Sequence, residues 1–258
     1  MKVYTYYEDV WGHLQPNGSR QGLPEDVYQE RKLVQRWKQN WENSGFEAVV
    51  LNKDDAEKHP KFDKIMDSLS KNCEGIRRFP CPSINSKRLS KYGASCFHRW
   101  LAYAALNQPE PFYVADYDVF NSSLPAMNNF KNPDVFTSYQ WATPSFVKGN
   151  SSAFDYFINL IERFASNVQE SISRHEQKDL SSVHDQDLIF MYADEIQQDA
   201  RIKLLPPPTL ISNYSSNEKL TPVIHLSHHS VEEAFNEKYS VENVLKRRLE
   251  LVSSLGLA

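Results

Sequence analysis

The sequence has 258 residues, of which 40% are hydrophobic and 24% are charged. A chain of this length and composition buries one core of ordinary size, which argues against an intrinsically disordered protein and leaves little room for two full domains. Its net charge is −4 and no segment is dominated by lysine and arginine, which argues against nucleic-acid binding.

No segment of the sequence signals a membrane. The longest unbroken apolar run, residues 100–106, is too short to cross a bilayer, and the first residues, MKVYTYYEDV, lack the apolar region of a secretory signal. The cysteines Cys73, Cys81 and Cys96 form no Cys-x-x-Cys pair, so neither a disulfide framework nor a zinc site is predicted. We expect a soluble, cytoplasmic protein without a transmembrane segment, or a fragment cut from a longer chain.

The beginning of the chain alternates strand, helix and strand. Residues 2–7 are mostly β-branched or aromatic and predict a first strand. A helix is expected to begin at Pro24, to carry valine and tryptophan at helical spacing, and to end at Gly45. Residues 46–51 predict the second strand. This strand–helix–strand unit is the building block of a parallel sheet.

Three further segments lead to a pair of acids. Residues 62–69 predict a short helix and residues 89–106 a long one, which Pro109 and Pro111 end. Residues 111–115, PFYVA, form a short apolar run of the kind that suits a strand covered on both faces. This predicted strand continues directly into Asp116.

The second half of the chain is less regular. Strands are predicted at residues 134–139 and 222–225, and helices at residues 150–164, 184–194 and 241–252. Lys148, Gly149 and Asn150 are expected to start a helix after a turn, with Asn150 as its cap. Ser230 and Glu233 resemble a capping box, and Gly256 can end the last helix. We therefore predict a single α/β domain over residues 1–258, with a mostly parallel central sheet flanked by helices.

Asp116 and Asp118 stand one residue apart where the predicted buried strand ends. Open α/β sheets bind their ligands at the carboxyl ends of the strands. Two desolvated, unpaired carboxylates repel each other, which costs free energy, and a divalent cation bound between them removes that cost. Mg²⁺ and Mn²⁺ typically bind one or two carboxylates together with substrate phosphate oxygens. The alternative is that Asp116 caps the next turn and Asp118 is solvated, since aspartate is frequent wherever strands end.

The segment from Lys91 to Phe120, KYGASCFHRWLAYAALNQPEPFYVADYDVF, resembles the donor-site core of the GT-A glycosyltransferases, which have a Rossmann-like fold. The resemblance implies that residues 1–120 bind the nucleotide sugar and residues 121–258 form the acceptor side. It matches Asp116 and Asp118 to the Asp-x-Asp signature, in which the second acid binds the metal. The first acid faces the ribose or reaches the metal through water. Two prolines replace the Gly-Gly that often precedes such a strand.

The resemblance also implies basic and imidazole groups at the same site. Lys91 and Arg99, on the helix before the strand, are expected to contact the donor. A histidine on a late strand often supplies a third metal ligand, and His225 fits that pattern, with Mn²⁺ slightly favoured over Mg²⁺ by a neutral imidazole. His228 could instead face the diphosphate. The alternative is a cluster of surface histidines on a loop.

Two acids on the acceptor side are candidates for a general base. Many GT-A chains carry an Asp-Gln pair where this sequence has SSVHDQDLIF. Asp185 or Asp187 could therefore take the proton of an acceptor hydroxyl, as an inverting transfer requires. Asp185 is equally a natural N-cap for the helix that follows it.

The end of the first predicted strand carries Thr5, Tyr6 and Tyr7. GT-A enzymes hold the nucleotide base at this place, and an aromatic ring there could stack on it. Because the side chains of a strand alternate, Tyr6 and Tyr7 cannot both face the pocket if the strand is regular.

The resemblance thus implies a metal-dependent glycosyltransferase with a UDP-sugar donor, a glycan or glycoprotein acceptor, and Mn²⁺ or Mg²⁺ as cofactor. Whether the sugar is a hexose or a pentose, and whether its configuration is retained, stays open. Phosphatases of the haloacid dehalogenase type also place Asp-x-Asp after an apolar strand, although this chain has Phe120 where they have threonine or valine. A protein of the same fold that binds nucleotide sugar or carbohydrate without turnover is the other rival.

Overall fold

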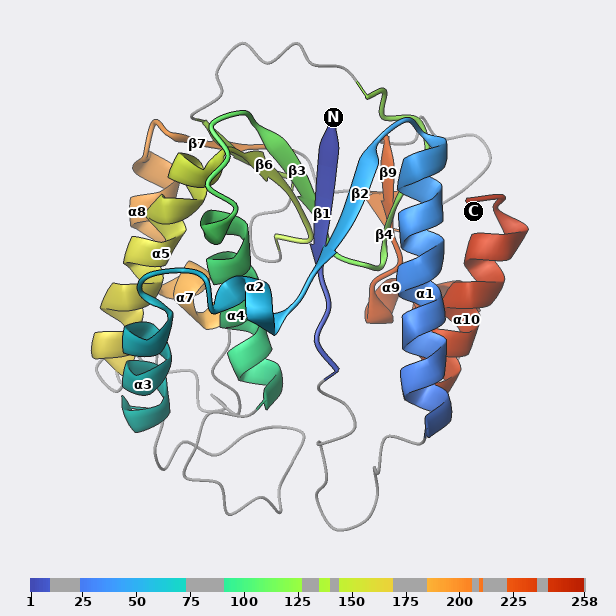
Figure 1. Ribbon diagram of the computed structural model, residues 1–258. Coiled ribbons are helices and arrows are strands. Elements are labelled where there is room, and N and C mark those ends of the chain that lie inside the picture. Colours follow the sequence, from blue (N-terminus) through green and yellow to red (C-terminus); the bar gives the residue numbers. More distant parts are fainter. Residues whose placement is uncertain are drawn as a thin grey trace.

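A computed structural model describes residues 1–9, 24–72, 91–126, 135–139, 144–168, 185–205, 209–210, 222–235 and 241–257. Its centre is a six-stranded sheet with the strand order β2-β1-β3-β6-β5-β7. The strands are β1 (Lys2–Tyr6), β2 (Glu47–Leu51), β3 (Phe112–Ala115), β5 (Phe136–Ser138), β6 (Phe146–Gly149) and β7 (Ile202–Leu204). Among these strands, only β6 is antiparallel to its neighbours, β3 and β5. The predicted mostly parallel sheet is therefore confirmed (Figure 1).

A second, smaller sheet contains three short strands in the order β4-β9-β8. Its middle strand β9 (Val223–His225) pairs antiparallel with β4 (Val119–Asn121) and parallel with β8 (Thr209–Leu210). Because β3 ends at Ala115 and β4 begins at Val119, the chain passes from one sheet to the other within residues 116–118.

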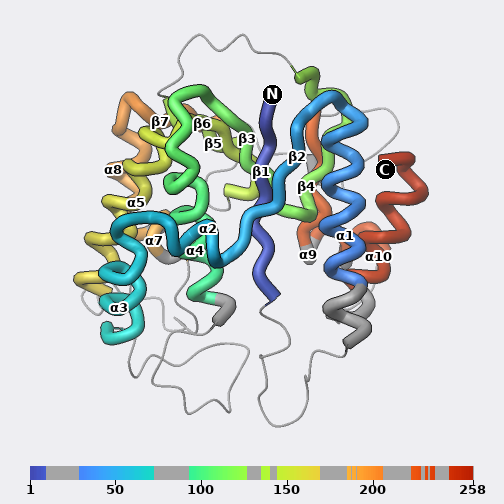
Figure 2. The backbone as a smooth tube through the Cα atoms, viewed as in Figure 1, coloured from blue at the N-terminus to red at the C-terminus, as the bar shows by residue number. Residues whose placement is uncertain are grey.

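Helices cover both faces of the central sheet, as Figure 1 and Figure 2 show. One layer contains α2 (Lys53–Ala56), α3 (Phe62–Asn72), α4 (Lys91–Ala105), α5 (Ser151–Ser166), α7 (Asp185–Met191) and α8 (Ala193–Gln198). The other layer contains α1 (Pro24–Asn43), α9 (His228–Phe235) and α10 (Val241–Ser254).

The side chains of the central strands alternate between two hydrophobic cores. Tyr4 and Val114 pack in the core that contains α4 and α5, whereas Val3 and Ala115 pack in the core that contains α1 and α10. Both faces of the sheet are therefore buried, as the short apolar run before Asp116 predicts.

Three predicted helix boundaries are confirmed by their cap geometry. The Asn150 side chain accepts a hydrogen bond of 2.9 Å from the backbone N–H of Ala153 and so caps α5. Gly45 and Gly256 follow α1 and α10 with φ of 84° and 63°, in the left-handed region that favours glycine.

The predicted helix start at Lys148 and Gly149 is wrong, because both residues belong to β6 and α5 begins at Ser151. All four residues of β6 pair with β3, and Gly149 lies opposite Phe112. A Cβ atom at Gly149 would lie 3.0 Å from the Cβ of Ala153, so the absence of a side chain lets the first turn of α5 approach the strand.

Two other local predictions also differ from the structure. The expected capping box at Ser230 is wrong, because α9 begins at His228 and the Ser227 hydroxyl oxygen accepts from the Ser230 N–H at 3.3 Å. The single helix predicted over residues 184–194 is two helices, α7 and α8, with Tyr192 between them.

None of the helices in the described part of the chain is long and apolar enough to cross a membrane. Cys96 is a buried thiol on α4, whereas Cys73 and Cys81 lie outside the described residues.

We expect Asn40→Ala to lower the free energy of unfolding by about 2–3 kcal/mol. The buried Asn40 side chain accepts from the Asn121 N–H at 2.6 Å and donates to the backbone oxygens of Asn121 and Leu257. It therefore ties α1 both to β4 and to the residues that follow α10, and its loss leaves these buried groups unpaired. Urea denaturation of the variant measures the loss. Gln39→Ala, at an exposed position of the same helix, is the control and should change stability by less than about 0.5 kcal/mol.

Candidate functional site

The Asp116–Tyr117–Asp118 turn lies at the carboxyl end of β3, beside the carboxyl end of the parallel strand β1. The Asp116 N–H donates to the Ser145 oxygen at 2.8 Å, and the Asp116 oxygen accepts from the Val119 N–H at 2.8 Å. The backbone of this residue therefore both extends the sheet and closes the turn. This edge of an open α/β sheet is where ligands bind.

Arg99 of α4 holds two carboxylates together. Its Nη1 donates to Oδ1 of Asp116 at 3.0 Å, while Nε donates to Oδ2 of Asp185 at 2.9 Å and Nη2 donates to the same oxygen. The Trp100 Nε1–H donates to that oxygen as well, at 2.8 Å. Asp185 is 3% exposed, so these donors satisfy a carboxylate that would otherwise be buried at a high cost.

The charge of Asp116 is only partly compensated by Arg99. Burial raises the pKa of the Asp116 carboxyl to about 6, with Arg99 acting against this shift and Asp118 adding to it. The carboxyl group thus changes its protonation state closer to neutrality than an ordinary aspartate does.

Asp118 contacts two groups that come from the C-terminal part of the chain. Arg248 of α10 donates from Nη2 to Oδ2 of Asp118 at 2.6 Å, and His225 Nε2 lies 3.5 Å from Oδ1. The Arg248 side chain is 3% exposed and also donates from Nε to the Leu226 oxygen at 2.7 Å. The Leu226 N–H in turn donates to the backbone oxygen of Asp118 at 2.8 Å.

The structure changes one premise of the sequence interpretation. The two carboxylates were expected to be unpaired and to need a cation, but Arg99 pairs with Asp116 and Arg248 pairs with Asp118. Part of the neutralisation that a metal would supply therefore comes from the protein itself.

The predicted metal ligands are brought together only in part. Within the described residues, no group of three or more His, Cys, Asp or Glu side chains is arranged to hold a metal ion. Asp118 Oδ1 and His225 Nε2, at 3.5 Å, come close to the separation of about 3 Å that neighbouring ligands of an octahedral Mg²⁺ would have. These two groups are therefore close enough to be ligands of one cation.

The middle residue of the motif is also fixed. The Tyr117 hydroxyl donates to Oε1 of Glu30, and the Tyr7 hydroxyl donates to Oε2 at 3.4 Å. The two tyrosine rings meet edge to face, with their centroids 5.9 Å apart. Burial and the Glu30 carboxylate raise the pKa of Tyr117 well above its ordinary value, so this phenol stays a hydrogen-bond donor.

Tyr6 points to the opposite face of β1 from Tyr7. Its hydroxyl donates to Oε2 of Glu8 at 2.6 Å, and Nδ1 of His98 lies 2.9 Å from the same oxygen. Burial opposes ionisation of Glu8, but the contacts with His98 and Tyr6 prevail and lower the pKa of the Glu8 carboxyl. Thr5 is fully buried. Of the three residues expected near a nucleotide base, only Tyr7 contacts the Asp-Tyr-Asp turn among the described contacts.

The other sequence-predicted residues are placed only in part. Asp185 is the first residue of α7, and its described side-chain hydrogen bonds are with Arg99 and Trp100. The side chains of Lys91, Asp187 and His228 lie outside what the structure describes. Their expected roles stay predictions.

Glu30 and Arg248 were missed, although the sequence carries a signal for both. Glu30 precedes Val34, Trp37 and Trp41 at helical spacing, and Arg248 falls between Val244 and Val252 in the same manner. A charged residue on the apolar stripe of an amphipathic helix must find a buried partner. Such a residue is thus a candidate for a site even where no motif surrounds it.

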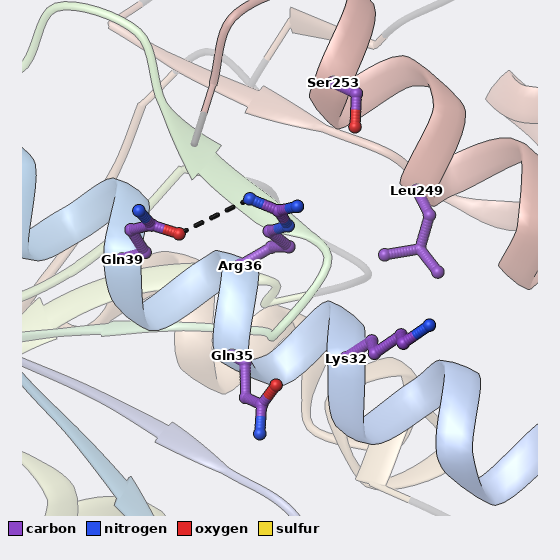
Figure 3. Close-up of a pocket in the computed structure, with 6 residues that line it drawn as sticks. All are labelled: Lys32, Gln35, Arg36, Gln39, Leu249 and Ser253. Carbon is purple, nitrogen blue, oxygen red and sulfur yellow. Dashed lines mark hydrogen bonds between the residues drawn. The ribbon is translucent and has the colours of Figure 1, made fainter.

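A surface pocket of about 360 Å³ lies elsewhere, between α1 and α10 (Figure 3). Five of its six lining residues have polar side chains, and the lining consists of Lys32, Gln35, Arg36, Gln39, Leu249 and Ser253. None of these residues belongs to the Asp-Tyr-Asp turn or to the groups that contact it, so this pocket is separate from the candidate site.

Comparisons with known proteins establish the fold. No protein-family model and no curated protein matches the chain. Among solved structures, the chain is similar to that of a glycosyltransferase involved in the glycosylation of the major capsid of PBCV-1, with 12% sequence identity and a TM-score of 0.50. The similarity covers 96% of this chain and 98% of the other. The likeness thus supports the mixed α/β fold over nearly the whole chain.

We expect Asp116→Asn to remove a pH dependence of stability. The folded-state pKa of about 6 lies above the ordinary value of 3.8, so Asp116 stabilises the fold most below pH 4, and this contribution is lost as the pH rises through 6. Relative to the Asn variant, the wild type should lose about 2 kcal/mol between pH 4 and pH 7, since one pKa unit corresponds to about 1.4 kcal/mol. Urea denaturation at a series of pH values measures this difference, and parallel curves would contradict the assignment.

Proposed function

We propose that this protein is a glycosyltransferase that moves a sugar from a nucleotide diphosphate sugar, preferably a UDP-sugar, to a hydroxyl group of a glycan or glycoprotein. The observation that carries the proposal is the 3.5 Å approach of Asp118 Oδ1 to His225 Nε2, next to Asp116 at the carboxyl end of β3. The fold likeness to a glycosyltransferase over nearly the full length of both chains supports it. Fold alone does not assign an activity, so the chemistry of the cluster has to support the choice of substrate.

Asp118 and His225 are the residues that would hold a divalent cation, Mn²⁺ in preference to Mg²⁺. When bound, such a cation supplies positive charge that stabilises a departing diphosphate. Arg248 contacts the other oxygen of Asp118, which orients the carboxylate. Two protein ligands leave room for phosphate oxygens, which is typical of cation sites that bind nucleotides.

Arg99 has a complementary role beside the cation site. It holds Asp116 on one side and Asp185 on the other, so Asp116 is kept at the end of β3 with one oxygen occupied. The contacts of Asp185 with Arg99 and Trp100 favour a positioning role for this carboxylate over transfer of the acceptor proton. Asp187 stays the other candidate for the general base.

Tyr7 is our candidate for contact with the nucleotide. It is partly exposed at the end of β1, and Tyr117 and Glu30 hold its ring and hydroxyl. An aromatic side chain held in one orientation can stack on a base with little further loss of entropy.

We expect Mn²⁺ with UDP to raise the melting temperature of the wild-type protein by several degrees. A ligand at about 100 times its Kd stabilises a fold by about 2.7 kcal/mol, and each kcal/mol shifts the melting temperature of a domain of this size by about 2–4 °C. A screen of nucleotide sugars with Mn²⁺, read by released nucleotide, then identifies the donor. Asp118→Asn should abolish the thermal shift and lower the transfer rate at least about 100-fold.

Asp63→Asn is the matched control, because Asp63 is exposed on α3. It should keep both the thermal shift and the transfer. Normal turnover by the Asp118 variant would refute the cation site. Stabilisation by UDP without transfer of any sugar would instead identify a non-catalytic binder, and trapping of beryllofluoride with release of phosphate would identify a phosphatase.

A further inference from the structure

Arg248 joins two segments that lie far apart in the sequence. Its guanidinium group donates to the Asp118 carboxylate at 2.6 Å and to the Leu226 oxygen at 2.7 Å. Asp118 belongs to the turn after β3, and Leu226 follows His225 directly at the end of β9. One buried side chain of α10 therefore contacts Asp118 itself and the residue that follows His225.

The backbone already holds these two segments side by side. Val119 pairs with His225 across β4 and β9, and the Leu226 N–H donates to the backbone oxygen of Asp118 at 2.8 Å. These bonds place the main chains, but they leave the torsion angles of the Asp118 side chain undetermined. The hydrogen bond from Arg248 to Oδ2 turns the other oxygen, Oδ1, toward Nε2 of His225.

The described residues give the His225 ring one close polar contact, with Asp118. The His225 side chain is 6% exposed, and its Nδ1 is buried without a hydrogen-bond partner among the described residues. Metal-binding histidines usually donate from the second ring nitrogen to a neighbouring acceptor, which fixes the ring. Here the described polar contact of the ring is with Asp118. The orientation of the Asp118 carboxylate therefore influences the orientation of the His225 ring.

We propose that Arg248 is a positioning residue that sets the separation of Asp118 and His225 and thereby determines the affinity of this pair for a divalent cation. The inference rests on the proposed function, because it takes the two residues to be cation ligands. It also makes the C-terminal helix a part of the site. This helix is anchored at its far end as well, where Asn40 donates to the Leu257 oxygen.

A purely electrostatic role for Arg248 would have the opposite effect. A guanidinium group repels a cation nearby, so removing its charge would strengthen cation binding if charge were all that mattered. A positioning role requires weaker binding after the same change. It also requires that lysine fail to replace arginine, because an ammonium group cannot donate to two acceptors in the fixed geometry of the guanidinium fork.

The test measures Mn²⁺ alone, titrated into the full chain and followed by the electron paramagnetic resonance signal of free Mn²⁺. We expect Arg248→Lys and Arg248→Gln each to lower Mn²⁺ affinity by about 10- to 100-fold, the range typical for residues that orient metal ligands. Millimolar methylguanidinium should restore part of the affinity of Arg248→Ala and none of the affinity of Asp118→Asn. A helix anchor without a role at the site would change stability but not Mn²⁺ affinity at a temperature where the variant is folded.

Arg247→Gln is the matched control. Arg247 is the neighbouring residue on α10, pairs with Glu250 at 2.7 Å and lies on the more exposed side of the helix, so the same loss of charge should leave Mn²⁺ affinity unchanged. Should Arg248→Gln fail to fold, the Arg248→Lys variant decides.

Unchanged or increased Mn²⁺ affinity in a folded Arg248 variant, with normal binding by the wild type, would overturn the inference and leave the proposed function intact. No Mn²⁺ binding by the wild-type protein would overturn the cation site itself, and this inference with it.

Discussion

The arrangement of this protein depends on how three buried or half-buried carboxylates are neutralised. Asp116, Asp118 and Asp185 gather at the carboxyl end of β3, where burial would make unpaired charges very costly. Arg99 pairs with two of them and Arg248 with the third. The two arginines come from helices on opposite faces of the central sheet, α4 and α10. The acidic cluster can therefore form only when both layers of helices are packed in place.

This constraint links the stability of the fold to the chemistry of its site. The Asp-Tyr-Asp turn is the point where the chain leaves the large sheet and enters the small one. Its backbone is held by Ser145, directly before β6, and by Leu226, directly after β9. Its three side chains are held by three different helices: Asp116 by α4, Tyr117 by α1 through Glu30, and Asp118 by α10. A rigid site of this kind can present charges in one arrangement, which is what binding of a diphosphate and a cation would require.

The likeness of this chain to a glycosyltransferase structure concerns the backbone fold, whereas the substrate has to be inferred from the side chains of the site. At 12% identity over nearly the full length of both chains, the backbone path is shared while most side chains differ. Activity is decided by particular residues at a site. The proposal for this protein therefore depends on the approach of Asp118 to His225 and on the arginines around them, which are features of its own chain.

Local features of the sequence were sufficient to locate the long helices and their caps at Gly45, Asn150 and Gly256. They also located the strands on either side of α1 and the acids after β3. Periodicity, capping and burial are encoded in neighbouring residues, which is why these features could be predicted. Local features could not locate β4, β6 and β7, whose three or four residues form strands only through pairing with distant partners. The pairing of the acids was also beyond reach. Arg99 stands 17 positions from Asp116 and Arg248 stands 130 positions from Asp118, and only the packing of α4 and α10 against the sheet brings these charges together.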